Sequence, residues 1–511
     1  MTDTSITALI ASITENLEDS VHLGNPVNVI NPTTGKVIYS LPQLNAAGVI
    51  ARVEQLRSAQ LSWAAKPVTE RAKVLKNLAK LLLEHQEQLL DLLQLETGKA
   101  RSHALEEMTG AVSAANYYGK ISPRVLARRR SRAGIPIATK TFVDQVPLGV
   151  VGIITPWNYP LALSMLDVLP ALAAGNGVLQ KADNQTALIT LYARALAVSA
   201  GVPEELYRVV TGPAAEVGNA ITDSVDYVAF TGSTATGRTV AERAAKRLIG
   251  YSLELGGKNP MIVLPGANLA KAAEIAIGGA FGSAGQLCVS IERLYVHRDQ
   301  FDEFSKLFAE RVSSLKVGKS KDFKNDVGSL TSAAQLARVS SFVEDAKGQG
   351  AKVLAGGTAL NELGPNFYAP TVLSDVPENA KMFHSEVFGP VIALTPYQNL
   401  AEAIEFANAT EYGLNASVVG DEKLALNVAA QIHAGSVNIN EGFRASFSSM
   451  SSPMGGFKAS GFGRRNGPYG LLRFTEPKSI GIAASWFRLP ARGSEYQRLA
   501  PLLKLMLRIL K

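Results

Sequence analysis

The sequence predicts an α/β protein built on doubly wound, largely parallel sheets, and three observations carry that prediction. From Pro147 onward, short apolar runs alternate with stretches of helical length. A second block with the same alternation begins after Gly257 and continues to about residue 440. Of the 511 residues, 47% are hydrophobic and 19% are charged, as in ordinary globular proteins. Such alternation is typical of parallel strands covered by helices on both faces.

The first block starts with GVVGIIT at 149–155, which predicts a buried strand, and a helix over 160–174 that Gly175 closes. The pattern then repeats, with strands at 177–182, 206–212 and 226–232 and helices at 186–200, 214–221 and 236–248. The second block predicts strands at 259–264 and 293–298 and helices at 269–280 and 299–315. Before both blocks, leucines and alanines at spacings of three and four predict a helix over 68–95.

Composition excludes several kinds of protein. The single cysteine, Cys288, rules out an intrachain disulfide and a multi-cysteine metal site. The six histidines show no HExxH spacing, so we expect no protein-bound metal. The first twenty residues lack the basic region of a secretory signal. The longest apolar run, 160–174, is too short for a membrane span and is interrupted by Asp167. We therefore expect a cytoplasmic protein.

The net charge of +7 is concentrated in two places. One is the run RVLARRRSR, from Arg124 to Arg132, and the other is the tail after Ser485, which has six basic residues and one glutamate. Neither run has the interleaved aromatic residues of a single-strand groove, so we expect no nucleic-acid partner. A solvated or inter-subunit surface explains both. The segment 499–511 predicts a basic amphipathic helix, which would dock on an acidic membrane surface or cover a neighbouring subunit.

Three segments carry residues capable of chemistry. In FTGSTATGR, at 230–238, Gly232 and Gly237 would let a phosphate approach a helix N-terminus, and a structural glycine turn is the alternative. Glu254 in ELGGKNP is either a satisfied carboxylate at a strand end or a catalytic base. Cys288 is either inert filler or a nucleophile, and near a helix start its pKa would be depressed. No histidine is close to Cys288 in sequence and the GxSxG motif is absent, so the sequence does not support a hydrolase with a Cys–His or Ser–His arrangement.

Six segments occur in a fixed order on this frame: PWNYP at 156–160, FTGSTATG at 230–237, ELGGKNP at 254–260, GQLC at 285–288, EVFGPV at 386–391 and PMGGFKASGFGR at 453–464. With them the sequence resembles the aldehyde dehydrogenase superfamily, from about residue 25 to 480. The resemblance implies that Cys288 attacks an aldehyde, and that the Asn158 amide and the Cys288 N–H stabilise the oxyanion. Hydride would pass to NAD or NADP, and Glu254 would activate the water that hydrolyses the thioester.

The resemblance also implies which residues hold the cofactor. Lys181 would lie near the adenosine ribose, Ser233 at the pyrophosphate, and Glu386 with Phe388 at the nicotinamide riboside. Trp157 would line the cofactor channel or be a core aromatic. Members that prefer NAD often have glutamate where this chain has Asn184, so the neutral side chain slightly favours NADP. The full set is Thr155, Pro156, Trp157, Lys181, Asn184, Gly232, Ser233, Gly237, Glu386 and Phe388.

Among the branches, the chain is loosely closest to succinate-semialdehyde dehydrogenases. Known members bind the distal carboxylate with two arginines, at positions where this chain has Gly282 and Leu166. Burying a carboxylate without a cation is costly. Either Arg444, which could also be a solvated loop residue, substitutes for them, or the substrate is a less charged aliphatic or aromatic aldehyde. The residues expected at the substrate are Tyr117, Leu166, Phe281 and Arg444.

Two other functions stay open at this point. A CoA-acylating aldehyde dehydrogenase is one, although such members generally lack a glutamate at the position of Glu254. A non-catalytic binding or structural member of the fold is the other. The resemblance further implies a homodimer or homotetramer. It divides the chain into a Rossmann-type cofactor-binding domain (1–121 and 145–256), a catalytic domain (257–448), bridging segments that form a small oligomerisation β-element (122–144 and 449–485), and a basic tail (486–511).

Overall fold

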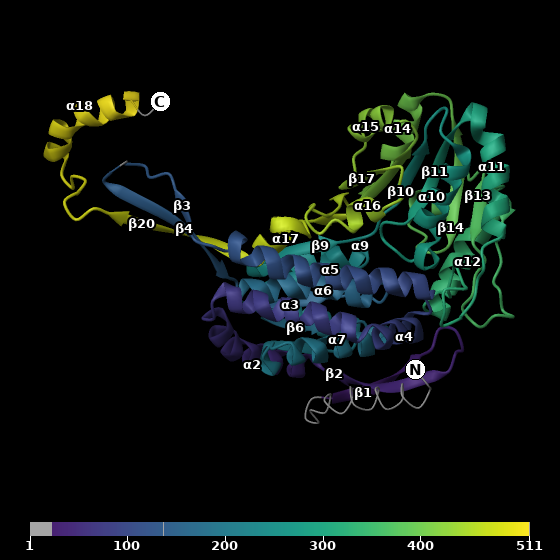
Figure 1. Cartoon of the computed structure of the whole chain (residues 1–511), viewed down its shortest axis with the longest axis horizontal. Helices are drawn as coiled ribbons and strands as arrows, with labels where there is room; N and C mark the ends of the chain where they lie inside the picture. Colours follow the sequence, from purple (N-terminus) through teal and green to yellow (C-terminus); the bar gives the residue numbers. More distant parts are fainter. Residues whose placement is uncertain (1–22, 136, 510–511) are drawn as a thin grey trace.

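The computed structural model describes residues 23–135 and 137–509, and its three largest sheets have six, seven and three strands. The six- and seven-stranded sheets form the body, and the three-stranded sheet projects from it as an arm that ends in a helix (Figure 1). The predictions made for the first twenty residues and for Leu510 and Lys511 concern residues outside the described ranges. Within those ranges, no helix has both the length and the apolar character needed to cross a bilayer.

The six-stranded sheet has the order β19-β9-β8-β5-β6-β7, and all its pairs are parallel except β19 with β9. Val151 and Ile153 of β5 belong to the apolar cluster under three helices, α5 (Arg101–Val125), α6 (Pro160–Ala174) and α7 (Ala187–Ser199). Val150 and Ile154 belong to the cluster under α2 (Ala46–Ala64) and α8 (Ala214–Ser224). Alternate residues are thus buried on opposite faces, as a doubly wound sheet requires. The strands are β5 (Val150–Ile154), β6 (Gly177–Lys181), β7 (Tyr207–Val210), β8 (Tyr227–Thr231), β9 (Gly250–Glu254) and β19 (Gly461–Phe462).

The helices around this sheet follow the predicted alternation. Helix α6 is buried along its whole length, begins with Pro160 at its first turn and ends at Gly175, whose φ of 101° suits a C-cap glycine. Asp167 is the one charged residue of that helix, which means that it needs a buried partner. The helices are α6 (Pro160–Ala174), α7 (Ala187–Ser199), α8 (Ala214–Ser224) and α9 (Thr234–Arg247).

The seven-stranded sheet has the order β12-β13-β14-β11-β10-β16-β17, and only β12 pairs antiparallel. Met261 and Val263 of β10 face the cluster under α10, α11 and α12, and Ile262 faces the cluster under α14 and α15. Its strands are β10 (Asn259–Val263), β11 (Ile291–His297), β12 (Lys352–Ala355), β13 (Thr371–Ser374), β14 (Val391–Tyr397), β16 (Asn415–Val419) and β17 (Ser436–Ile439). Its helices include α10 (Leu269–Phe281), α11 (Arg298–Ser313), α12 (Ala333–Gly348), α14 (Leu400–Asn408), α15 (Glu422–Ala429) and α16 (Arg444–Phe447).

The N-terminal part adds a hairpin and a helical layer to the six-stranded sheet (Figure 1). Helix α5 packs against both α3 and α6. The single helix predicted over 68–95 is two helices, because the chain bends at His85, whose φ and ψ of −97° and 22° are not helical. The elements are β1 (Leu23–Ile30), β2 (Val37–Leu44), α2 (Ala46–Ala64), α3 (Val68–Glu84), α4 (Gln86–Thr97) and α5 (Arg101–Val125).

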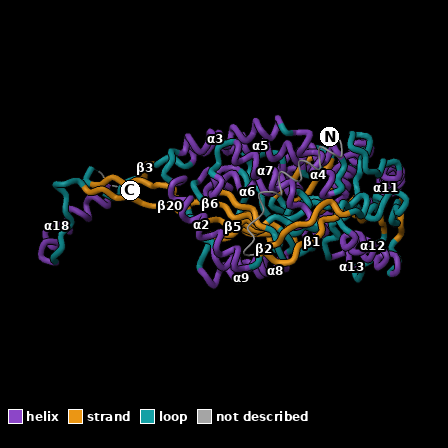
Figure 2. Tube along the Cα trace, turned by 90° about the horizontal axis from the view of Figure 1, so that it is seen from below, coloured by secondary structure: helices purple, strands orange, loops and turns teal. Residues whose placement is uncertain are grey.

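The arm is formed by β3 (Arg129–Ser131), β4 (Thr139–Pro147) and β20 (Thr475–Ala483), followed by α18 (Gly493–Ile509). Strand β20 pairs antiparallel with β4 over nine residues, from Thr475 opposite Pro147 to Ala483 opposite Thr139. Both views show these elements extending away from the body (Figure 2). The fold class predicted from the sequence is confirmed, and the domain boundaries proposed above stay a prediction.

Candidate active site

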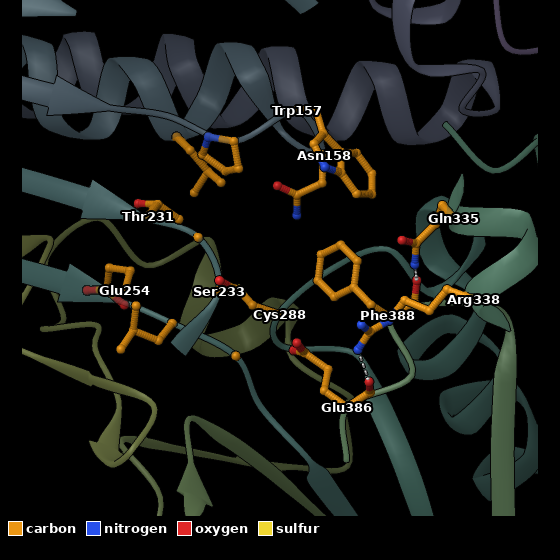
Figure 3. Close-up of a pocket in the computed structure, with 15 residues that line it drawn as sticks. Trp157, Asn158, Thr231, Ser233, Glu254, Cys288, Gln335, Arg338, Glu386 and Phe388 are labelled. Carbon is orange, nitrogen blue, oxygen red and sulfur yellow. Dashed lines mark hydrogen bonds between the residues drawn. The ribbon is translucent and has the colours of Figure 1, made fainter. Parts of the chain in front are cut away.

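A cavity of about 210 Å³ lies where three strands of the six-stranded sheet end, beside the loop that carries Cys288 (Figure 3). The carboxyl ends of β5, β8 and β9 run directly into its lining. Open parallel sheets bind their ligands at this edge. The lining residues are Pro156, Trp157, Asn158, Leu163, Thr231, Gly232, Ser233, Glu254, Leu255, Gly256, Cys288, Gln335, Arg338, Glu386 and Phe388.

Cys288 follows α10 through a tight turn and is half-buried at the cavity. Ser283 and Ala284 in that turn have φ of 50° and 54°, in the left-handed region that non-glycine residues rarely adopt. A side chain on Gly285 would lie 2.0 Å from the carbonyl oxygen of Gly389. The turn therefore depends on a glycine and on two residues with strained backbone dihedral angles. Such backbone strain tends to occur at functional sites.

The thiol of Cys288 is mostly protonated in this environment. Burial raises its pKa to about 12, the carboxylates of Glu254 and Glu386 act in the same direction, and Arg465 opposes them. The residue precedes strand β11 rather than a helix, so no helix N-terminus stabilises a thiolate. The pKa depression predicted from the sequence is wrong for this reason. A thiolate here needs a proton acceptor or a nearby cation.

Asn158 lies near the end of the turn between β5 and α6, with its side chain toward the Cys288 loop. Its Nδ2 donates to the carbonyl oxygen of Gln286 at 3.0 Å. The next residue, Tyr159, accepts a hydrogen bond at its hydroxyl from Ser283 at 3.0 Å. Two hydrogen bonds thus join the Asn158 turn to the Cys288 loop and set the distance between the amide and the sulfur.

A buried ion pair fixes the other side of the Asn158 turn. Lys99 Nζ donates to the Asn158 carbonyl oxygen at 2.7 Å and pairs with Glu107, and both side chains are at most 2% exposed. The Glu107 carboxylate also accepts the backbone N–H of Leu161 at 2.7 Å and of Ala162 at 3.2 Å. It therefore satisfies free donors of the first turn of α6. Neither residue was singled out in the sequence, because lysine and glutamate usually mark solvated helix faces.

Glu254 is the last residue of β9 and is 4% exposed. Burial raises the pKa of its carboxyl group to about 7, while the guanidinium groups of Arg465 and Arg473 lower it. Its Oε2 is buried and has no hydrogen-bond partner. An unpaired buried oxygen next to a cavity is a site for a substrate or water hydrogen bond. A carboxyl group that titrates near 7 is suited to exchange protons at neutral pH.

Asp167 has the buried partners that its position in α6 requires. Arg465 donates to it from Nε at 2.8 Å and from Nη2, and Arg473 donates from Nη2. Arg465 also donates to Thr231 Oγ1 at 2.5 Å, while its Nη1 is buried without a partner. One carboxylate and two guanidinium groups leave a net positive charge behind Glu254. The sequence signal for this cluster was the acid in an otherwise apolar helix.

Glu386 and Phe388 form the wall opposite Glu254 in Figure 3. The Glu386 Oε1 accepts the backbone N–H of Gly257 at 2.8 Å, and burial raises the pKa of this carboxyl group to about 8. The segment is held by Glu292, which accepts the N–H groups of residues 387 and 388 and pairs with the buried Lys258. Phe388 packs edge-on against Trp157, with 5.6 Å between ring centroids.

A second cavity, of about 580 Å³, shares five lining residues with the first and continues along the same sheet edge. It ends at the N-terminus of α9, where Ser233 is the N-cap and accepts the N–H of Thr236 at 3.3 Å. Lys181 and Asp183 line its far side. Unpaired N–H groups of a helix start beside a lysine fit a phosphate-containing ligand, and the elongated space fits a dinucleotide.

The model of the aldehyde dehydrogenase family matches residues 19–480 of this chain. The chain belongs to the aldehyde dehydrogenase family. A relative from Mycobacterium ulcerans, named "Putative succinate-semialdehyde dehydrogenase (NADP+) 2", is 48% identical over 90% of this chain and 89% of the relative. The NADP+ succinate-semialdehyde dehydrogenase of Escherichia coli is 38% identical, over 90% of this chain and 95% of that protein.

Two solved structures have the same fold. The crystal structure of an NADP-dependent enzyme from Escherichia coli is 37% identical, with a TM-score of 0.86 over 90% of this chain and 95% of that chain. The NAD+ complex of an aldehyde dehydrogenase from Bacillus cereus is 33% identical, with a TM-score of 0.87 over 93% of this chain and 98% of that chain. The resemblance inferred from the sequence motifs is therefore confirmed at the level of the family.

In this aldehyde dehydrogenase, most of the cofactor residues predicted from the sequence line one or both cavities, and two do not. Asn184 is turned away, since its side-chain oxygen accepts the N–H of Gly212 at 3.1 Å. Its neighbour Asp183 lines the larger cavity instead. Gly237 is a packing residue, because a Cβ there would lie 2.5 Å from the Leu255 side chain. The predicted residues that do line the cavities are Thr155, Pro156, Trp157, Lys181, Gly232, Ser233, Glu386 and Phe388.

None of the four substrate residues predicted from the sequence lines the smaller cavity. Phe281 is a core residue: it is 2% exposed and stacks on Phe308 with 6.4 Å between centroids. Leu166, also 2% exposed, packs in the core under α6. Tyr117 is half-buried on α5 and contacts Tyr118 edge-on. Both Phe281 and Leu166 are sealed inside apolar clusters, so their burial does not support the substrate contacts predicted for them.

Arg444 does lie beside the position that lacks an arginine. A Cβ on Gly282 would be 3.9 Å from its Nη2, and one on Gly278 would be 2.8 Å from its Nη1. The two glycines therefore leave room for this guanidinium near the Cys288 loop. Arg444 is also ion-paired, with Glu106 at 3.0 Å and Glu441 at 3.6 Å.

The lining also includes two residues that the sequence analysis missed. Gln335 and Arg338 come from α12, which lies within the second block but is not one of the helices given bounds from the sequence. Arg338 donates to the carbonyl oxygen of Glu386 at 2.7 Å, and Gln335 donates to that of Phe388 at 2.6 Å. They hold the backbone of the 386–388 segment. Nothing in the sequence distinguishes them from the other polar residues of an amphipathic helix.

Proposed function

We propose that the protein oxidises an aldehyde to a carboxylic acid with NADP+ or NAD+, through a covalent intermediate on Cys288. The observation that supports this most directly is the convergence of Cys288, Asn158, Glu254 and Glu386 on one cavity of about 210 Å³. The adjoining space along the sheet edge fits a dinucleotide, with Lys181 and the start of α9 on its wall. When bound, the nicotinamide supplies the hydride acceptor.

In the proposed reaction, the sulfur of Cys288 attacks the aldehyde carbon and its proton passes to a carboxylate of the cavity, Glu254 or Glu386. The carbonyl oxygen then develops negative charge, which the Asn158 Nδ2 and the Cys288 N–H stabilise. Loss of hydride from the thiohemiacetal leaves a thioester. Glu254 removes a proton from water as it attacks the thioester, and the sulfur leaves with the acid released. The buried hydrogen bonds of Lys99 and Glu107 keep the Asn158 turn in place throughout.

The pH dependence of turnover is the first prediction. Because burial raises the pKa of Glu254 to about 7, its basic form is present above that pH and is lost below it. Where hydrolysis of the thioester limits the rate, kcat should rise with pH, by about tenfold from one unit below this pKa, and level off above it. A kcat profile from pH 5.5 to 8.5 measures this. A flat profile with demonstrated rate-limiting hydrolysis would contradict the role of Glu254.

Cofactor choice is the second prediction. We propose that NADP+ is accepted and preferred, which the names of the relatives and the position of Lys181 support. Asp183, two residues away in the same cavity, repels a 2′-phosphate. The two side chains should therefore act in opposite directions. Lys181→Ala should lower the ratio of kcat/KM for NADP+ to that for NAD+ by about tenfold, and Asp183→Asn should raise it. Variants that change the ratio in the same direction would contradict the assignment.

For the substrate, we propose succinate semialdehyde, with its carboxylate at Arg444. The names of the relatives and the place of Arg444 beside Gly282 support this. A less charged aliphatic or aromatic aldehyde is the second candidate. The observation that favours it is that Glu106 and Glu441 already neutralise Arg444.

A pair of variants separates these candidates and is the third prediction. Arg444→Gln should lower kcat/KM for succinate semialdehyde about tenfold and leave kcat/KM for butanal nearly unchanged, since butanal has no distal charge. Glu106→Gln removes a competing carboxylate, so it should raise kcat/KM for succinate semialdehyde. A wild-type preference for butanal, with Arg444→Gln affecting both aldehydes equally, would favour the uncharged substrate.

A further inference from the structure

The arm carries more positive charge than the whole protein. We define the arm as residues 128–147 and 475–511, that is, the three-stranded sheet and the segment that includes α18. The sequence places twelve lysines and arginines on it against three acidic residues, a net charge of +9. The complete chain has +7, so the rest of the molecule carries −2. The arm and the body therefore have net charges of opposite sign.

The basic side chains of the arm are exposed wherever the structure describes them. Within those residues, two of them have a carboxylate at salt-bridge distance: Arg128 with Asp144 at 2.6 Å and Arg488 with Glu495 at 3.6 Å. In the tail after Ser485, which lies outside the predicted oligomerisation element, most of the charge is therefore available to an anionic partner. The exposed basic residues are Arg128, Arg129, Arg130, Arg132, Lys140, Lys478, Arg488, Arg492, Arg498, Lys504 and Arg508.

The arm also exposes large apolar side chains, which a purely electrostatic surface does not need. Trp486 is 69% exposed, and Leu502 and Leu505 on α18 are each 53% exposed. Lys504 and Arg508 lie one helical turn apart on the same helix and form a basic face. Ile137, Ile482, Leu489 and Tyr496 are further exposed apolar residues of the arm. An amphipathic helix with a basic face and a nearby tryptophan is suited to the boundary between headgroups and acyl chains.

Helix α18 begins after the part of the chain that the family shares. The family model ends at residue 480, within β20, and α18 starts at Gly493. The helix extends away from the body (Figures 1 and 2). No described helix can span a bilayer. A surface contact, and not an insertion across the membrane, is the arrangement that these features fit.

We propose that the tail at the end of the arm, residues 486–509, docks the protein on an anionic lipid surface, with α18 lying in the plane of the headgroups. Lipid phosphates match the basic side chains, and the acyl boundary receives Trp486 and the leucines of α18. A nucleic acid would match the charge, but it offers no apolar layer for the leucines. A second copy of this chain can contact the strands of the arm, as the resemblance implies, but a body whose net charge is only −2 is a weak match for the basic tail after Ser485. The anionic lipid surface matches both the charge and the apolar side chains.

The test is co-sedimentation of the full-length protein with vesicles of phosphatidylcholine containing 30% phosphatidylglycerol, compared with phosphatidylcholine alone. We expect binding to the anionic vesicles at 50 mM salt, and a loss of at least tenfold in affinity at 500 mM salt, because salt screens the charges. Lys504→Glu with Arg508→Glu should lower the affinity at least tenfold. Leu502→Ser with Leu505→Ser, which keeps the charge, should also lower it.

The matched control makes the same charge change on the body, at the exposed Lys306 and Lys423. Lys306→Glu with Lys423→Glu should bind vesicles like the wild type. Thermal unfolding of every variant shows that the fold is retained. Because none of these residues lines the cavities, the variants should oxidise aldehydes at the wild-type rate. If the wild-type protein oxidised no aldehyde, that result would contradict the proposed function and would leave the lipid-binding proposal unaffected.

Trp486 gives a second, direct measurement. Its fluorescence should be quenched by vesicles of brominated phosphatidylglycerol, and Trp486→Phe should remove that quenching. The proposal is overturned if the wild type does not bind anionic vesicles, or if the body control weakens binding as much as the α18 variants do. It is also overturned if the leucine variant changes only the oligomeric mass in solution, because α18 would then cover a second copy of the chain.

Discussion

Replacing Cys288 by serine should abolish aldehyde-dependent formation of NADPH or NADH, by at least about a thousandfold in kcat. An alcohol is a much weaker nucleophile than a thiolate at neutral pH, and the cavity offers no histidine to activate it. Among the described residues of the lining, the carboxylates of Glu254 and Glu386 are the groups that could accept its proton. The steady-state rate of absorbance change at 340 nm measures the effect.

The cofactor site should survive this substitution, because Lys181 and Ser233 lie in the adjoining cavity. Binding of NADP+ and NAD+, followed by calorimetry, is therefore the matched control for Cys288→Ser. Retained oxidation in the serine variant would contradict the nucleophile assignment. Lost cofactor binding would instead show that the substitution damages the fold of the cavity.

Replacing Glu254 by glutamine should separate the two half-reactions. Glu386 still lines the cavity and can accept the thiol proton, so formation of the thioester does not need Glu254, and one equivalent of reduced cofactor per subunit should still appear in a fast burst. Hydrolysis does need it, and the steady-state rate after the burst should fall by about a hundredfold or more. Stopped-flow absorbance resolves both phases. Glutamine is close to glutamate in size, and so the buried space beside Thr231 and Arg465 stays filled.

The pH profile of kcat for the Glu254→Gln enzyme gives a second measurement. With glutamine at position 254, the rise in kcat near pH 7 should disappear, since the group that titrates there is gone. A variant that keeps both its steady-state rate and the rise would show that another group activates the water.

The sequence alone predicts the parts of this protein that depend on local patterns. The strands and helices from 149 to 315 follow from apolar periodicity, and α6 is bounded by Pro160 and Gly175, as expected for a helix start and end. The motif residues Cys288, Asn158 and Glu254 come from separate segments, and the fold brings all three to one cavity. Their catalytic roles rest on the proposed mechanism.

What the sequence does not predict depends on where side chains point in three dimensions. Asn184 and Asp183 are adjacent, and only the backbone of the turn decides that Asp183 faces the cavity while Asn184 bonds to Gly212. Phe281 is near Cys288 in sequence, yet its ring is on the core side of α10. The pKa of Cys288 is similarly non-local, because it depends on Glu254 and on burial.

The buried charges were the hardest to predict. Lys99 and Glu107 form a buried pair against the Asn158 turn, although each residue type is usually solvated. Asp167 was recognisable as unusual within its apolar helix, but its partners Arg465 and Arg473 are about 300 residues away in the chain. Such long-range pairs leave no periodic signal in one sequence.

The most direct test of the covalent mechanism is peptide mass spectrometry of the Glu254→Gln enzyme, quenched in acid after one burst with aldehyde and oxidised cofactor. We predict one acyl group per subunit, its mass equal to that of the substrate acid less water, on the peptide that contains Cys288. Hydroxylamine should remove it, as expected for a thioester. A full burst of reduced cofactor with Cys288 unmodified, or with the acyl group on another residue, would contradict the mechanism.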